Sequence, residues 1–196
     1  MSRLTTYASG CVAVLAAIQL FLPAAALADA STANGLAWAQ GPASGGVYPY
    51  CVNDSVGLQQ HDSASGVFPA AGLYPITAVS ISSSCTANSR GGYSGTAKVV
   101  PAGWLAIYRI LYVWNGSNWA TCTSDSDWVY NATQNVTLRL LSPGTQDGPV
   151  TAYPLTATGG FGPCGPGYYG LIAYTYAWTG TQWLGGSIWS DYLYTP

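Results

Sequence analysis

Few residues in this chain of 196 amino acids could act as a catalytic acid, base or nucleophile. Glutamate is absent, all seven acidic residues are aspartates, and the only histidine is His61. Asp127 and Asp191 stand at equivalent places in a repeat described below, where an aspartate ordinarily accepts hydrogen bonds at a turn or strand end. The chain also lacks a G-x-S-x-G nucleophile elbow. We therefore expect no enzyme activity that depends on His61 or on an aspartate.

Four cysteines follow the N-terminal segment: Cys51, Cys85, Cys122 and Cys164. An even number of cysteines in an exported protein is typical of disulfide bonds. Because the chain has no C-x-x-C pair and a single histidine, we expect neither a metal site nor a cofactor. Three pairings are possible. We predict Cys51–Cys85 and Cys122–Cys164, since each pair joins neighbours in the sequence.

Residues 1–30 have the layout of a secretory signal peptide. Arg3 precedes an apolar run over residues 11–27, and small residues follow, so that cleavage after Ala28 or Ala30 fits. A membrane anchor is the alternative, but seventeen residues interrupted by Pro23 are at the short end of the range that spans a bilayer. We therefore predict a secreted, extracellular protein with no membrane association after cleavage.

The composition after residue 30 favours strands over helices. Only ten side chains are charged, whereas 24 are aromatic. Val, Thr, Tyr and Trp, which favour strands, are abundant, and the helix formers Glu, Lys and Met are nearly absent. A net charge of −2 gives no broad basic surface, so we expect no nucleic-acid partner. The expected fold class is all-β.

Turn-forming clusters divide the chain into short predicted strands. Residues 31–46 are Gly-rich and without periodicity, which predicts a flexible leader, and residues 47–196 form the folded region. The predicted strands are Ile76–Ser82, Thr96–Val100, Trp104–Trp114, Trp119–Thr123, Asp127–Tyr130, Asn135–Leu141, Val150–Leu155, Tyr168–Trp178, Gln182–Ile188 and Asp191–Tyr194. Roughly ten strands at this spacing predict an antiparallel β-sandwich, immunoglobulin-like or jelly-roll-like. In architecture the chain resembles immunoglobulin-like sandwiches in general, a resemblance that implies no function.

An internal repeat covers residues 103–130 and 167–194. Aligned without a gap, the two segments share eight identical residues, and the common pattern is an aromatic strand, W-x-G-x-x-W, and a closing D-aromatic-aliphatic-Y. The sequence thus predicts an imperfect duplication of a β unit. The duplicated units could build one domain or two small tandem domains.

The W-x-G-x-x-W motif predicts a hairpin closed by a four-residue loop with glycine at a position of positive φ. Such a hairpin places Trp114 opposite Trp119, and Trp178 opposite Trp183, on one face of the sheet. Alternation adds Tyr112 to the first ladder and Tyr176 to the second. If Cys122 faces the core, the ladders face outward. The alternative is a strand buried on both faces, with the aromatic residues in the core.

These observations predict a non-enzymatic binding module. Flat aromatic side chains on an outer face would bind an extracellular polymer, either a polysaccharide or another cell-surface component, through Tyr112, Trp114, Trp119, Tyr176, Trp178 and Trp183. Two alternatives stay open. One is a structural, self-associating extracellular protein. The other is an inhibitor of an extracellular hydrolase that presents the disulfide-braced loop at residues 159–167.

Overall fold

The computed structural model describes residues 46–61, 72–87, 93–140 and 162–195, together with the backbone course of residues 32–39. This part of the chain holds strands and turns, and no helix in it is long and apolar enough to span a membrane. The strands are β1 (Thr32–Ala39), β2 (Val47–His61), β3 (Gly72–Ala87), β4 (Tyr93–Ala97), β5 (Leu105–Trp114), β6 (Trp119–Ser124), β7 (Val129–Tyr130), β8 (Thr137–Leu140), β9 (Gly167–Trp178), β10 (Trp183–Trp189) and β11 (Leu193–Thr195).

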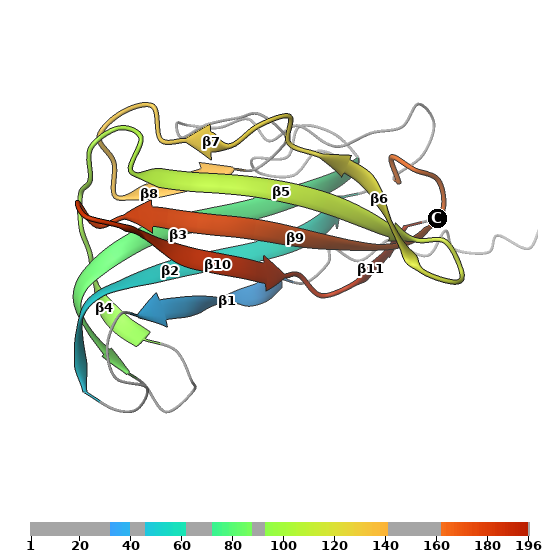
Figure 1. Cartoon of the computed structure of the whole chain (residues 1–196). Coiled ribbons are helices and arrows are strands. Elements are labelled where there is room, and N and C mark those ends of the chain that lie inside the picture. The colour runs from blue at the N-terminus through green and yellow to red at the C-terminus, as the bar shows by residue number, and fades with distance from the viewer. Residues whose placement is uncertain (1–31, 40–45, 62–71, 88–92, 141–161, 196) are drawn as a thin grey trace, which may run out of the picture.

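The strands form two antiparallel sheets that pack face to face, which confirms the predicted all-β sandwich. In the first sheet the order is β1-β2-β3, and β4 and β8 follow one another along the far edge of β3. In the second sheet β9 and β5 are central. The edge of β5 carries β6 and β7, and the edge of β9 carries β10 and β11. Figure 1 shows β5, β9 and β10 lying across β2 and β3.

Inward-facing side chains of both sheets build the hydrophobic interior. One cluster includes Val52, Ile81 and Ile107, and a second includes Leu58 and Leu171, all of them buried. Each cluster draws on strands of both sheets, so the described strands share a single sandwich interior. Burying side chains of this kind contributes roughly 1.5–3 kcal/mol each.

A polar layer separates the two hydrophobic clusters. Each of the four central strands has one polar residue at an inward position between members of the two clusters: Asp54 on β2, Thr77 on β3, Arg109 on β5 and Thr175 on β9. The Thr175 hydroxyl donates a 2.6 Å hydrogen bond to the Asp54 carboxylate, which joins the two sheets. A hydrogen bond of this kind offsets part of the cost of removing polar groups from water.

Arg109 is held by a buried ion pair with Asp125. Its Nε and Nη2 donate to the two carboxylate oxygens at 2.9 and 2.8 Å, and both side chains are at most 5% exposed. Arg109 Nη1 also donates to the carbonyl oxygen of Pro75 at 3.2 Å, across the interior. The Asp125 carboxylate further accepts the backbone N–H of Arg109 at 2.9 Å. Asp125 is therefore a structural residue that fixes the course of the chain after β6.

The first two strands differ from the sequence prediction. Residues 32–39 belong to β1, which pairs with β2, so the expectation of a flexible leader over 31–46 is wrong for this stretch. Strand pairing through the backbone needs no side-chain periodicity, so the Gly-rich composition of this stretch did not indicate β1. No strand was predicted before Ile76, yet β2 is fifteen residues long. The predicted strand Val150–Leu155 and the signal peptide at 1–30 lie outside the described residues.

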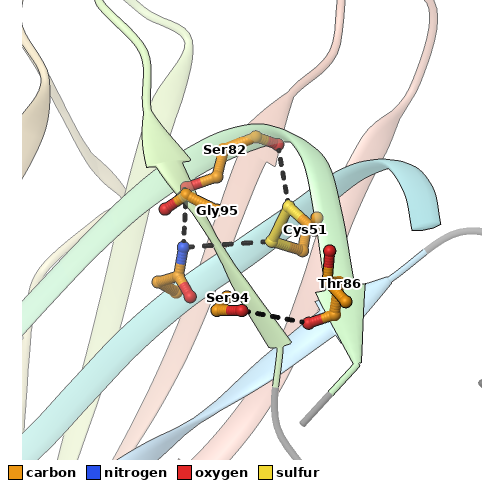
Figure 2. The surroundings of a disulfide bond; sticks show 7 residues. Cys51, Ser82, Thr86, Ser94 and Gly95 are labelled. Carbon is orange, nitrogen blue, oxygen red and sulfur yellow. Dashed lines mark hydrogen bonds between the residues drawn. A yellow bond between two sulfur atoms is a disulfide. The ribbon is translucent and has the colours of Figure 1, made fainter. Parts of the chain in front are cut away.

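Both predicted disulfides are confirmed. Cys51 and Cys85 join β2 to β3 with a Cα–Cα distance of 5.8 Å, and both residues are fully buried. Figure 2 shows β4 passing over this bond at Gly95. A Cβ atom on Gly95 would lie 3.0 Å from Cys85 Sγ, closer than normal packing, so glycine lets β4 cover the disulfide.

The second disulfide links β6 to the turn before β9. Cys122 and Cys164 are 5.8 Å apart at Cα, and Tyr169 on β9 fixes the turn. The Tyr169 hydroxyl donates to the carbonyl of Gly165 at 2.5 Å and accepts the N–H of Cys164 at 3.0 Å. Burial raises the pKa of the Tyr169 phenol, and the hydrogen bond from the backbone N–H of Cys164 partly offsets this shift.

Candidate functional site

The two W-x-G-x-x-W motifs form matching hairpins. Trp114 lies directly opposite Trp119, and Trp178 lies opposite Trp183, with ring centroids 5.6 Å apart in each pair. Cross-strand aromatic pairs of this kind contribute roughly 0.2–1 kcal/mol to the pairing of two strands. The four-residue loops and the paired tryptophans are therefore as predicted.

The hairpin loops are built in the same way in both copies. Gly116 and Gly180 have φ values of +96° and +107°, a region in which a side chain is strained. The side-chain oxygen of the first loop residue accepts N–H groups from the third and fourth residues. This oxygen is Asn115 Oδ1 in one loop, at 3.0 and 2.9 Å, and Thr179 Oγ1 in the other, at 3.3 and 3.2 Å. Different residue types thus close the same turn.

The aromatic ladders lie on the outer face of the second sheet. Alternate residues of β5, such as Leu105, Ile107 and Leu111, are buried between the sheets. Trp114 belongs to the opposite set and is 37% exposed, and Trp183 is 43% exposed. Cys122 packs with the inner cluster, as the outward alternative requires. The structure therefore favours that alternative over burial of the ladders in the core.

Aromatic side chains cover much of this outer face, which we call the aromatic face. Around the first hairpin lie Tyr112, Trp114, Trp119, Trp189 and Tyr192, here called the 115 cluster. Around the second lie Tyr108, Trp128, Tyr130, Tyr174, Tyr176, Trp178 and Trp183, here called the 179 cluster. All six predicted site residues belong to one or the other. The structure divides them between the two clusters and does not bring them together.

Each cluster combines a hairpin of one repeat copy with the closing strand of the other. Trp128 and Tyr130 come from the first copy, yet they contact Tyr176 and Trp183 of the second, with ring centroids 5.6 and 6.3 Å apart. In the reverse sense, Tyr192 of the second copy stacks on a tryptophan of the first, as described below. The exchange follows from the antiparallel pairing of β5 with β9, which brings each closing strand beside the opposite hairpin.

A hollow opens within the 179 cluster. It is lined by Ala106, Trp128, Tyr130, Tyr176 and Trp183 and has a volume of about 260 Å³. Ala106 on β5 lies at its base, between Tyr130 on β7 and Tyr176 on β9, which pair with this alanine from either side. A cavity of about 150 Å³ accommodates a benzene molecule. The hollow is therefore large enough for one six-membered ring.

Trp128 and Tyr130 were not predicted to belong to the site, although they line the hollow together with Trp183. Both belong to the D-aromatic-aliphatic-Y part of the repeat, which was recognised as a motif but not placed on a face. Tyr192 was missed for the same reason, whereas Trp189, whose counterpart is Asp125, lies outside the repeated motifs. The signal was the repeat itself, because both of its conserved aromatic motifs face the same side of one sheet.

The residues weighed for catalysis are dispersed over the fold. His61 is the last residue of β2, opposite Gly72 on β3. Asp127 is exposed, and its carboxylate accepts the N–H of Trp128 at 2.7 Å, as expected of a strand-end acceptor. Asp191 is also exposed. Within the described ranges, no three His, Cys, Asp or Glu side chains come together as a possible metal site.

Comparison of the chain with protein-family models, with curated proteins and with solved structures gives no match.

Proposed function

We propose that this protein is an exported, non-enzymatic binding module that attaches to an uncharged extracellular polysaccharide through its aromatic face. The observation that carries the proposal is the pair of aromatic clusters, with partly exposed Trp and Tyr side chains, on the outer face of the second sheet. Aromatic rings offer a large apolar surface at low rotamer cost. They suit the apolar faces of sugar rings, whose hydroxyl groups then stay in water.

Export is supported by two further observations. Two disulfides are compatible with an oxidising extracellular environment. Residues 1–30 have the composition of a cleavable signal peptide. N-terminal sequencing of the protein recovered from the culture medium tests this part of the proposal. Cleavage after Ala28 or Ala30 would make Asp29 or Ser31 the first residue. A mature chain that still begins at Met1 contradicts it.

Charge favours an uncharged ligand. The whole chain has a formal net charge of −2, so an anionic polymer gains no general attraction. Among the described residues, the positive charge of Arg109 is buried and paired with Asp125. Lys98 lies against the rings of Tyr50 and Trp104, at 4.9 and 5.9 Å, and not in the 115 or 179 cluster.

A pull-down of the purified mature chain on cellulose, chitin, peptidoglycan and whole cells tests the function. We expect retention on at least one uncharged polysaccharide, and a loss of retention when Trp178 and Trp183 are both replaced by alanine. The matched control is Val99→Ala, which changes a side chain that is 53% exposed outside the aromatic clusters. Equal retention of the parent and the tryptophan variant would count against the proposal.

Self-association through the aromatic face is the second candidate, because exposed apolar patches of this kind also mark protein interfaces. Sedimentation velocity over a range of concentrations separates the two functions. A monomer that binds the polymer supports the first. A concentration-dependent dimer that the tryptophan variant abolishes, without any polymer binding, supports the second.

A further inference from the structure

The two aromatic clusters occupy equivalent positions about an approximate twofold axis. In the pairing of β5 with β9, Arg109 lies opposite Ala173, which is its own counterpart in the repeat. Residues at equal distances on either side of this pair therefore exchange under the axis. The counterpart of Ala106 is Gly170, and both have small side chains beneath the outer aromatic rings.

The space over Gly170 is filled by the protein itself. Tyr192, the counterpart of Trp128, stacks on Trp119 with ring centroids 4.9 Å apart. A Cβ atom placed on Gly170 would lie 3.3 Å from the Tyr192 ring and 3.7 Å from the Trp119 ring. The tyrosine thus occupies the place that is open over Ala106, where the hollow measures about 260 Å³.

The difference comes from the register of the closing strands. Tyr130 on β7 pairs with Ala106, eight residues before Trp114 on β5, whereas Tyr194 on β11 pairs with Tyr168, ten residues before Trp178 on β9. The second closing strand therefore reaches two residues further along its partner. This shift brings Tyr192 over Gly170, because Leu193 pairs with Tyr169.

The buried ion pair accounts for the shorter reach of the first closing strand. The pairing of β6 with β5 has an irregularity that leaves Cys122 without a partner on β5. The strand then ends next to Asp125, whose carboxylate binds Arg109. In the second copy the counterpart of Asp125 is Trp189, which still pairs with Ile172 on β9. The first copy therefore advances less far, and its aromatic residues surround Ala106, which is 3% exposed at the base of the hollow.

Together these observations lead to an inference that rests on the proposed function and makes it more specific. We propose that each chain has one ring-binding subsite, not two. The hollow over Ala106 takes a single pyranose ring of an uncharged polysaccharide, stacked against Trp183 and Trp128, while Tyr192 blocks the equivalent place over Gly170. The described lining has no charged side chain, and the negative faces of its rings match the weakly positive C–H groups of a neutral sugar.

Isothermal titration of the mature chain, disulfides intact, with soluble hexasaccharides of cellulose and of chitin tests the inference. We expect one site per chain. Trp183→Ala should weaken binding by about tenfold or more, as expected for an aromatic anchor in a pocket. Its control is Val99→Ala, 53% exposed outside the aromatic clusters, which should change affinity less than twofold. Trp119→Ala, at the equivalent hairpin position, should weaken binding less than Trp183→Ala because its ring already stacks on Tyr192.

Two further variants act without removing a tryptophan. Ala106→Val adds two methyl groups beneath the rings that line the hollow and should reduce binding; because Ala106 is only 3% exposed, a neighbouring ring must shift to make room. Tyr192→Ala uncovers Gly170 and Trp119, and it should raise the number of sites from one towards two. Thermal melting of each variant shows whether a change in binding follows from unfolding. Ala106→Val keeps the test decisive if Trp183→Ala fails to fold.

Equal losses in Trp183→Ala and Trp119→Ala, or two sites in the parent, overturn the single-subsite inference and leave the proposed function standing. Unchanged binding in Ala106→Val also overturns it. If the parent binds neither the oligosaccharides nor any insoluble polysaccharide, the proposed function fails, and the inference fails with it.

Discussion

Replacing Asp125 by alanine would remove the carboxylate that binds the buried guanidinium of Arg109 through both of its oxygens. The side chains of the pair are 3% and 5% exposed, so water screens their interaction very little. The substitution removes the acceptors of two side-chain hydrogen bonds, at 2.9 and 2.8 Å, and of one backbone N–H at 2.9 Å. The bond from Arg109 Nη1 to the Pro75 carbonyl, at 3.2 Å, does not involve Asp125. Removal of one partner of a buried pair typically costs about 3–5 kcal/mol.

Urea unfolding at neutral pH with the disulfides intact measures this loss. For a domain of this size, about 3–5 kcal/mol corresponds to a fall in Tm of roughly 6–20 °C. The double variant Arg109→Met with Asp125→Ala should recover much of the loss, because no charge then stays buried without a partner. A cost below about 1 kcal/mol for Asp125→Ala, or a double variant no more stable than the sum of the singles predicts, would refute the reasoning.

Three other changes test separate parts of the structure. Because burial raises the pKa of Tyr169, the neutral phenol contributes stability at neutral pH that is lost as the pH rises above about 10, and Tyr169→Phe should remove this alkaline decline in urea titrations. Gly185→Ala should destabilise the fold much more than Gly116→Ala. Both glycines have positive φ, but only a Cβ atom at position 185 would clash with the backbone of β9, and equal midpoints of the two variants in thermal melts would contradict this. Replacing Cys51 and Cys85 by alanine should cost about 3–4 kcal/mol by the loop-entropy relation for a separation of 34 residues, measured by the same melts, and a negligible change would show that packing under β4 suffices.

Local spacing made part of the fold predictable. The W-x-G-x-x-W motif determines the hairpin, its loop and its paired tryptophans within six residues, and the structure has all three. The disulfides were predictable for a similar reason, because few cysteines leave few pairings. By contrast, β2 was missed since its inward alternation of Val52 and Val56 is interrupted by Asp54, a partly buried polar residue whose partner Thr175 lies 121 residues away.

The face of the ladders and the hollow depend on distant contacts. On β5 both sets of alternating side chains are largely apolar, so the pattern alone left burial in the core as an alternative. Only the packing of Leu105 and Leu111 against the first sheet settles which set is outside. The hollow over Ala106 depends on where β7 meets β5, a register that local spacing does not specify.

The exchange of closing strands between the two repeat copies also sets the order in which the protein can assemble. Each hairpin closes through residues that are neighbours in the chain, and such hairpins form in about 1–10 μs. The contacts of Trp183 with Tyr130, and of Trp119 with Tyr192, need both hairpins to be paired through β5 and β9. Pairing of distant segments is slow, because the entropy of loop closure is lost before the stabilising contacts form. The aromatic face is therefore a late product of folding, completed only when the whole second sheet is in register.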